Sequence, residues 1–181
     1  MLKNFLRHFK TAHKVQYTNT NNFYQDYFDQ LGGMQFGGCQ FNAFRLQDIP
    51  KWKEYIADAF PMLAGKVLPF GYSWEGTCFC VDIRDGKVII CDVGGGECYA
   101  IPQSMQNFLN EDLIKHGREL LELPDYKKWV AKNGMLQYGN CAGLKVPVFL
   151  GGSEENGNRE VTDMEVYWGV LGQVKKQIMG K

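Results

Sequence analysis

The sequence predicts an α+β fold in which a central mixed or antiparallel sheet is flanked by helices. Short apolar runs separated by glycine turns occupy 67–102 and are typical of strands, whereas apolar residues at helical spacing lie before and after them. The length of 181 residues fits one domain spanning 1–181, and a hydrophobic content of 45% is enough to form its core. Within it we expect a helical N-terminal part at 1–31, sheet and helices at 32–133, and a distinct C-terminal part at 134–181.

Two helices are expected before the sheet. Apolar residues at helical spacing predict the first over 2–14 and the second over 23–31. The polar run TNTNN supplies an N-cap for the second helix, and the glycine pair at 32–33 ends it. A short strand is expected within 34–44.

A third helix is expected from Asp48 to Phe60. Asp48 is a favourable N-cap residue, and Pro50 fits the first turn because its missing N–H would have no helical partner there. Pro61 then ends the helix.

The sheet should contain a hairpin at its centre. Residues 78–83 and 88–93 predict two strands joined by a tight turn at 84–87, and 97–101 predicts the next strand. The run DVGGGE at 92–97 contains three glycines but no following lysine, so a hairpin turn is the better interpretation than a phosphate-binding loop.

The cysteines of these strands could form a row of thiols. A two-residue turn would place Cys80 opposite Cys91, with Cys78 on the same face, and the next turn would bring Cys98 opposite Cys91. Such a row could be a zinc or redox site, but structural zinc sites favour CxxC knuckles and free cysteine commonly serves as a small buried hydrophobe. We therefore expect no metal and no cofactor, and the six cysteines are too sparse for a disulfide scaffold.

The chain after the sheet is expected to be mainly helical. A helical region at 105–133 should break near Pro124, and KVPVFLGG at 145–152 predicts a short strand or extended segment. The polar run SEENGNRE at 153–160 predicts an exposed loop.

A terminal helix is expected near the end of the chain. Thr162 and Glu165 have the spacing of a capping box. Apolar residues of an amphipathic stripe then follow, namely Met164, Tyr167, Leu171, Val174 and Ile178. The first turn of this helix, EVYW, could equally form a strand.

Catalytic chemistry finds little support in the sequence. Of the three histidines, His8 and His13 lie in the basic N-terminal segment and His116 in a charged helix, and none neighbours a candidate nucleophile. We therefore expect a protein that is not an enzyme. A hydrolase with a spatial Cys–His or Ser–His pair remains an alternative, as does a structural or oligomerisation module.

Acidic residues near the C-terminus are the candidate partner-binding site. Glu154, Glu155, Glu160 and Asp163 cluster before the terminal helix, and Trp74 lies in a glycine-flanked segment where we expect it to be partly exposed. The cluster could simply be a solubilising loop with carboxylates near a helix N-terminus. The sharper hypothesis is an acidic patch that meets a basic partner surface.

Charge and hydropathy limit the partners. Twenty basic and twenty acidic residues balance, so we expect no nucleic acid partner. No apolar run is long enough for a membrane-spanning helix, and the N-terminus lacks the pattern of a secretory signal. These observations predict a cytoplasmic protein that does not bind membranes; the oligomeric state is not predicted.

The C-terminal motifs resemble a known family. CAGLKVPVFLGG at 141–152 and NREVTDMEVYWGVLGQ at 158–173 are similar to the signature of the C-terminal domain of type VI secretion DNase-immunity proteins, an uncharacterised bacterial family. Looser similarity extends the match to residues 31–173. The N-terminal part, of about 30 residues, is shorter than in the family, and the cysteines of the predicted sheet lie outside its pattern.

The resemblance implies a fold and a function. The family is distantly similar to the SUKH superfamily, α+β modules that recur as immunity proteins, so a SUKH-like architecture is expected. It also implies a protein that binds and neutralises a co-encoded toxin, possibly a nuclease, in stoichiometric fashion. The resemblance carries over no catalytic residues.

Overall fold

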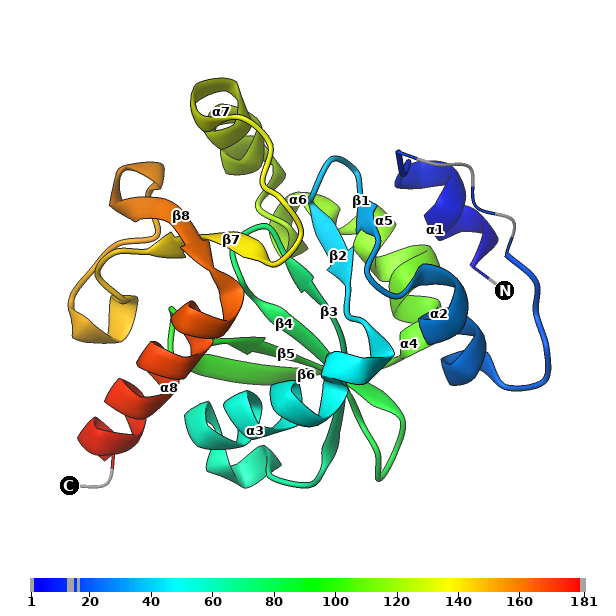
Figure 1. The fold of residues 1–181 in the computed structure, drawn as a ribbon, viewed down its shortest axis with the longest axis horizontal. Coiled ribbons are helices and arrows are strands. Elements are labelled where there is room, and N and C mark those ends of the chain that lie inside the picture. Colours follow the sequence, from blue (N-terminus) through cyan, green and yellow to red (C-terminus); the bar gives the residue numbers. More distant parts are fainter. Residues whose placement is uncertain (1, 13–14, 16, 180–181) are drawn as a thin grey trace.

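The computed structural model describes residues 2–12, 15 and 17–179, and it has the predicted α+β fold. Every strand pair is antiparallel, which decides between the mixed and antiparallel alternatives. Six strands follow one another in chain order across the larger sheet, and a two-stranded sheet lies near the C-terminus (Figure 1). The strands are β1 (Gln35–Phe36), β2 (Phe41–Ala43), β3 (Val67–Ser73), β4 (Cys78–Asp82), β5 (Lys87–Asp92), β6 (Glu97–Ser104), β7 (Asn140–Leu144) and β8 (Arg159–Asp163).

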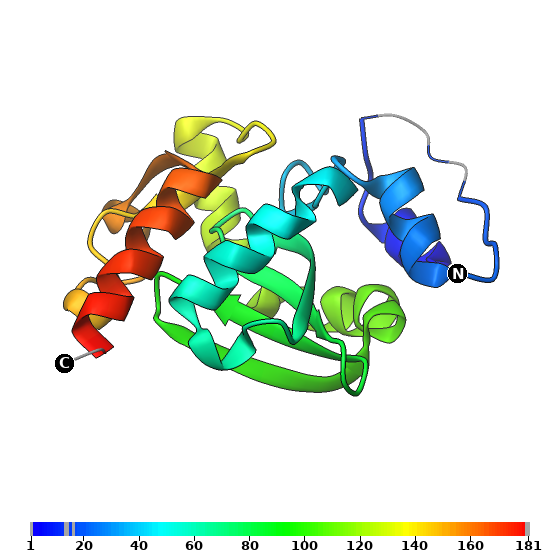
Figure 2. The same ribbon diagram turned by 60° about the horizontal axis from the view of Figure 1, so that its bottom comes forward.

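The helices lie on both faces of the larger sheet (Figures 1 and 2). They are α1 (Lys3–His8), α2 (Phe23–Leu31), α3 (Ile49–Ala59), α4 (Met105–Asn107), α5 (Leu113–Lys115), α6 (Gly117–Leu120), α7 (Leu123–Asn133) and α8 (Met164–Met179). None of the helices within the described ranges combines the length and apolar character that crossing a membrane requires.

Aromatic side chains fill the core on both sides of the sheet. On one face α3 packs against α8, where the rings of Trp52 and Trp168 lie 6.2 Å apart. On the other face Phe79 of β4 contacts Phe108, which follows α4, with ring centroids 5.5 Å apart. Edge and tilted ring contacts of this kind stabilise beyond the buried area alone.

The first helix is shorter than predicted. α1 ends at His8, whereas the sequence predicted a helix over 2–14, of which residues 13–14 lie outside the described residues. Phe9 leaves the helix in an extended conformation and is buried, and the Lys10 carbonyl accepts a hydrogen bond of 2.9 Å from Gly37 N. A tertiary contact thus competes successfully with helical hydrogen bonding.

The next two helices agree with the prediction except at one cap. α2 spans the predicted residues, and its N-cap Asn22 accepts a hydrogen bond from Gln25 N at 3.2 Å. α3 ends before Pro61 as expected, but the Asp48 side chain makes no capping hydrogen bond because a 3₁₀ turn at Leu46–Asp48 leads directly into the helix.

The central hairpin forms, but its predicted register is wrong by two residues. Cys78, not Cys80, lies opposite Cys91, because the connection between β4 and β5 takes four residues rather than two. Asp82 holds this wider turn: its carboxylate accepts from Arg84 N at 2.9 Å and its carbonyl from Gly86 N at 2.8 Å. The pairing of Cys91 with Cys98 across β5 and β6 is confirmed.

The helical region after the sheet is divided more finely than expected. A π-helical turn at Phe108–Asp112 joins α4 to α5, and the chain bends between α6 and α7 at Glu122, whose φ of 41° lies in the left-handed region. Pro124 is in the first turn of α7, so the break comes just before it rather than at it.

Of the short strand or extended segment predicted at 145–152, the strand is wrong. Residues 148–150 form a 3₁₀ turn, and the strand is β7 immediately before, paired with β8. β7 contains small residues because it passes beneath the aromatic ring of Tyr167: a Cβ at Gly143 would lie 2.8 Å from that ring. Strand propensity favours larger residues, so the sequence pattern pointed to the wrong segment.

The terminal helix is confirmed as α8, but its cap is different. Asp163 Oδ1 accepts hydrogen bonds from Glu165 N and Val166 N at 2.8 and 3.0 Å, whereas the Thr162 hydroxyl donates to the Glu160 carbonyl. The capping box is therefore wrong, and Glu165 instead pairs with Lys51 of α3.

Candidate functional site

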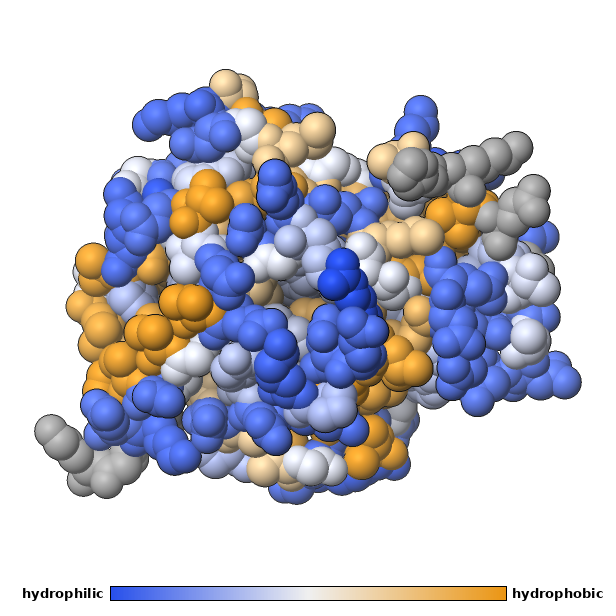
Figure 3. All heavy atoms as spheres, in the orientation of Figure 1, coloured by the Kyte–Doolittle hydropathy of each residue, from blue (hydrophilic) through white to orange (hydrophobic). Residues whose placement is uncertain are grey.

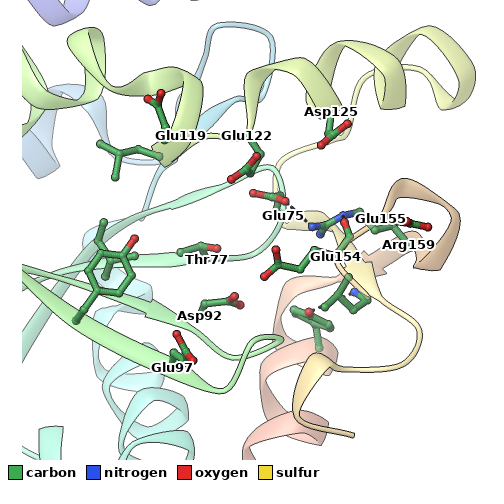
Figure 4. A pocket seen from close by; sticks show the side chains of 15 residues that line it. Glu75, Thr77, Asp92, Glu97, Glu119, Glu122, Asp125, Glu154, Glu155 and Arg159 are labelled. Atoms are coloured by element: carbon green, nitrogen blue, oxygen red, sulfur yellow. Dashed lines mark hydrogen bonds and ion pairs between the residues drawn. The ribbon is translucent and has the colours of Figure 1, made fainter. Parts of the chain in front are cut away.

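An acidic cleft is the candidate functional site. It has a volume of about 360 Å³ and lies between one end of the larger sheet, the bend from α6 to α7, and the C-terminal segment around β8 (Figure 4). Its lining includes eight carboxylates and one guanidinium group: Glu75, Asp92, Glu97, Glu119, Glu122, Asp125, Glu154, Glu155 and Arg159. We refer to this set as the acidic cleft.

The floor of the acidic cleft is the exposed end of β5 and β6. Ile90 lies opposite Tyr99 and Asp92 opposite Glu97, so alternation along the strands places all four on the same face. Ile90 is buried and Tyr99 is 52% exposed, which gives the floor an apolar and aromatic part beside its carboxylates.

The predicted hairpin turn after Asp92 is confirmed, and two of its glycines lie very close to neighbouring side chains. Asp92 Oδ1 accepts a hydrogen bond from Gly94 N at 2.9 Å, so its carboxylate folds back over the turn. A Cβ at Gly95 would lie 2.5 Å from Asp92 Oδ2, and one at Gly94 would lie 2.3 Å from the hydroxyl of Tyr167. Burial raises the pKa of Asp92 although turn N–H groups oppose the change.

The α6–α7 wall rests on Trp74. The Trp74 indole Nε1 donates a 2.8 Å hydrogen bond to the carbonyl of Leu121, directly before the strained Glu122. Trp74 is fully buried, so the expectation that it is partly exposed is wrong. Its ring packs in an apolar cluster against Trp129, and the Arg159 guanidinium carbon lies 5.3 Å from the ring centroid.

Arg159 forms the opposite wall and is the positive charge within the acidic cleft. Its side chain pairs with Glu75 at 2.5 Å and donates hydrogen bonds to the carbonyls of Ala142 and Glu154 at 3.1 and 3.2 Å. Only 7% of the Arg159 side chain and 12% of the Glu75 side chain are exposed. The loop at 153–160, predicted to be exposed, therefore contains one buried cationic side chain, that of Arg159. The Glu75 carboxylate and the two carbonyl groups compensate for the loss of its hydration.

Burial dominates the electrostatics of the acidic cleft. It raises the pKa of Glu75 to about 7, against the lowering effect of Arg159 and with further raising by Glu122 and Asp92. The pKa of Glu122 is also raised, by burial and by the nearby Glu154. One guanidinium group does not balance the carboxylates, so the acidic cleft favours an additional cation.

The acidic cleft brings together part of the predicted site. Glu154 and Glu155 line it, whereas Glu160 and Asp163 are exposed outside its lining and Asp163 caps α8. The assignment of these residues and of Trp74 as partner contacts stays a prediction. The sequence analysis missed six carboxylates of the lining because they are isolated acids on strands and helix ends, with no common motif.

The histidine, cysteine and acidic side chains bear on whether the protein holds a catalytic or metal site. Within the described ranges, no group of three or more His, Cys, Asp or Glu residues could hold a metal ion. His8 and His116 are on the surface, and His13 lies outside the described residues. Burial raises the pKa values of the Cys78 and Cys80 thiols well above the ordinary value for cysteine, which keeps both thiols protonated and poorly nucleophilic.

Comparison with known families confirms the resemblance for the C-terminal part. Residues 103–175 match the family described as T6SS immunity protein Tdi1, C-terminal. The match includes both outer walls of the acidic cleft, from Glu119 to Arg159, but not its floor. Residues 31–102, for which the sequence suggested a looser similarity, lie outside it.

A solved structure shows the same fold over most of the chain. The crystal structure of Atu4351 from Agrobacterium tumefaciens aligns with a TM-score of 0.72 at 18% sequence identity, covering 96% of this chain and 89% of that one. At this identity the likeness concerns the fold alone. No curated protein matches the chain.

Proposed function

We propose that this protein neutralises a co-encoded bacterial toxin in the cytoplasm by binding it stoichiometrically. The match of residues 103–175 to the Tdi1 immunity family supports the class of function. A SUKH-like relationship, expected from the sequence, remains part of this proposal. The single observation that supports the mode of action is the acidic cleft, whose carboxylates converge from the turn between β3 and β4, from β5 and β6, from α6, α7 and the bend between them, and from the segment before β8.

The acidic cleft suits a basic protein partner. A toxin that acts on DNA or RNA must present cationic side chains to phosphates, and the same side chains would be attracted to an unbalanced group of carboxylates. Exposed acids at the rim, such as Glu119, Glu154 and Glu155, would steer association, while the half-buried floor would contribute specificity. Covering those cationic side chains would exclude nucleic acid from the toxin without any chemical step.

Co-expression with the adjacent toxin tests the proposal. The polypeptide encoded beside this gene, limited to its C-terminal domain, is expressed with and without the present chain, and growth is recorded. We expect rescue of growth and a 1:1 complex in calorimetry. Absence of both binding and rescue would contradict the proposed function.

Charge reversal identifies the binding surface. Glu119→Lys, Glu154→Lys and Glu155→Lys together should weaken toxin binding by about 100-fold or more with little loss of stability, because these side chains are exposed. Glu54→Lys on α3, also exposed but outside the acidic cleft, is the matched control and should bind as the parent chain does. Glu160→Lys separates the two surfaces: a loss as large as that of the triple variant would favour the loop predicted from the sequence over the acidic cleft.

A further inference from the structure

The outer strand of the larger sheet has an unpaired edge. β6 is the last strand in the sheet order and pairs only with β5 among the described strands. Each of its residues is exposed or half-buried, and Figure 2 shows the strand along the lower rim of the sheet. An open edge of this kind presents backbone N–H and C=O groups that another extended chain can pair with.

The usable part of this edge is short and well defined. Pro102 has no backbone N–H, and the pairing with β5 shifts register beside it, so regular pairing is limited to Glu97–Ile101. At about 3.3 Å per residue, this stretch is roughly 16 Å long. It accommodates one short strand.

The edge and the acidic cleft are continuous. Glu97 and Tyr99 belong both to β6 and to the lining of the acidic cleft, while Cys98 alternates to the opposite face. A strand added beside β6 would lie about 4.8 Å away, with every second side chain next to Glu97 and Tyr99. Basic residues at those positions would meet the carboxylates of the acidic cleft and the exposed ring of Tyr99.

We propose that the partner adds an extended, lysine- or arginine-bearing segment to β6 and directs its alternate basic side chains into the acidic cleft. The inference rests on the proposed function, because it takes the toxin as the source of that segment. Charge argues against a second copy of this chain as the occupant. Antiparallel pairing of two β6 strands would place two acidic clefts next to each other on one sheet face, where their carboxylates would repel.

A peptide probe separates strand addition from simple charge attraction. The probe is a seven-residue peptide in which lysine alternates with threonine, used with the full chain and followed by NMR. A second peptide has the same side chains but is N-methylated at alternate amides, which removes backbone donors and keeps the charge. We expect the first peptide to bind at least about 10-fold more tightly than the second, and a peptide with glutamate in place of lysine not to bind.

Amide hydrogen exchange locates the bound peptide. Amides within Glu97–Ile101 that exchange rapidly in the free protein should be protected at least about 10-fold when the lysine peptide is bound. Glu97→Lys should abolish this protection, whereas Glu54→Lys should leave it unchanged. Equal binding of the methylated and unmethylated peptides, no binding at millimolar concentration, or protection outside β6 would each overturn the inference.

The same measurements distinguish failure of the inference from failure of the proposed function. If the adjacent toxin binds and the triple charge reversal abolishes binding, but the β6 amides gain no protection in that complex, the edge is not used and neutralisation stands. If the lysine peptide is added to β6 but the toxin neither binds nor is neutralised, the edge site stands and the proposed function is wrong.

Discussion

Replacing Arg159 by methionine should destabilise the protein more at pH 8 than at pH 5. The side chain is almost completely buried, pairs with Glu75, donates to two carbonyl groups and lies over the ring of Trp74. Methionine keeps much of the volume but removes the charge and the donors. Glu75 would then be a buried carboxylate whose remaining charged neighbours, such as Asp92, are acids.

The magnitude follows from the pKa of Glu75. Its ordinary value is 4.5 and its value in the folded protein is about 7. Each tenfold change in an acid dissociation constant corresponds to about 1.4 kcal/mol, so ionising Glu75 in the folded state costs about 3 kcal/mol. A carboxyl group that binds its proton more tightly when folded lowers the free energy of unfolding as pH rises from about 4.5 to about 7, and the cost is complete above that.

Without Arg159 the pKa of Glu75 should rise further, because the guanidinium group is the main influence that lowers it. Near pH 5 Glu75 stays protonated, so Arg159→Met should cost only its hydrogen bonds and packing, about 1–2 kcal/mol. At pH 8 the parent chain has already ionised Glu75, whereas the variant would have to keep it protonated; this adds at most about 1.4 kcal/mol, for a total loss of about 2.5–3.5 kcal/mol.

Urea denaturation at pH 5 and pH 8 measures these losses. The control is the double variant Arg159→Met with Glu75→Gln, in which no buried carboxylate is left to ionise at position 75. It should recover most of the extra loss at pH 8 and show little additional pH dependence. Equal destabilisation by Arg159→Met at both pH values, or no recovery in the double variant, would refute the electrostatic reasoning.

Three further predictions concern individual side chains. Glu122→Gly should raise the free energy of unfolding by about 0.5–1 kcal/mol, because glycine tolerates a φ of 41°. The same change should weaken toxin binding, because it removes a carboxylate from the acidic cleft. A loss of stability in urea would contradict the backbone argument. Asp163→Ala should lower the free energy of unfolding by about 1 kcal/mol in the same assay, because it removes the N-cap of α8. Thr162→Ala should lower it by less than half as much. The reverse order would support the capping box predicted from the sequence. In the native protein an aromatic disulfide reagent should label Cys98 alone among the thiols of the larger sheet, because the others are fully buried. The variant Cys98→Ser should abolish this labelling. Rapid labelling that persists in Cys98→Ser would support the hypothesis of a reactive cysteine.

The apolar surface of α8 bears on the alternative that the protein is an oligomerisation module, which a measurement of its size in solution would test. Figure 3 shows hydrophobic side chains gathered over this helix on the left of the face in view, and Val166, Val170 and Ile178 are about half exposed. The predicted amphipathic stripe is buried at its N-terminal end, at Met164, but not at Ile178. The helix therefore presents an apolar outer face, at Val166 and Val170, as well as an uncovered C-terminal end at Ile178.

Several features were predictable from the sequence because neighbouring residues decide them. The extent of α2 depends on the Asn22 cap and the glycines that follow it, and the turn after Asp92 depends on a run of glycines in which Gly96 has a positive φ of 82°. The α+β class and the terminal helix follow from apolar periodicity, which reports the local backbone conformation. The resemblance of the C-terminal motifs is confirmed over 103–175, while the extent of the domain at 1–181 stays a prediction.

Other features were decided only by the tertiary structure. α1 stops early because Lys10 pairs with Gly37, and the register of the central hairpin depends on a turn organised by Asp82. Trp74 is buried because side chains distant in the sequence, including Trp129 and Arg159, pack around it. The acidic cleft is the clearest case: burial and charge are sums over all neighbours in space, and its carboxylates come from segments as far apart as Glu75 and Glu155. The sequence by itself determined which acids are available, and only the folded chain decided which of them share one site.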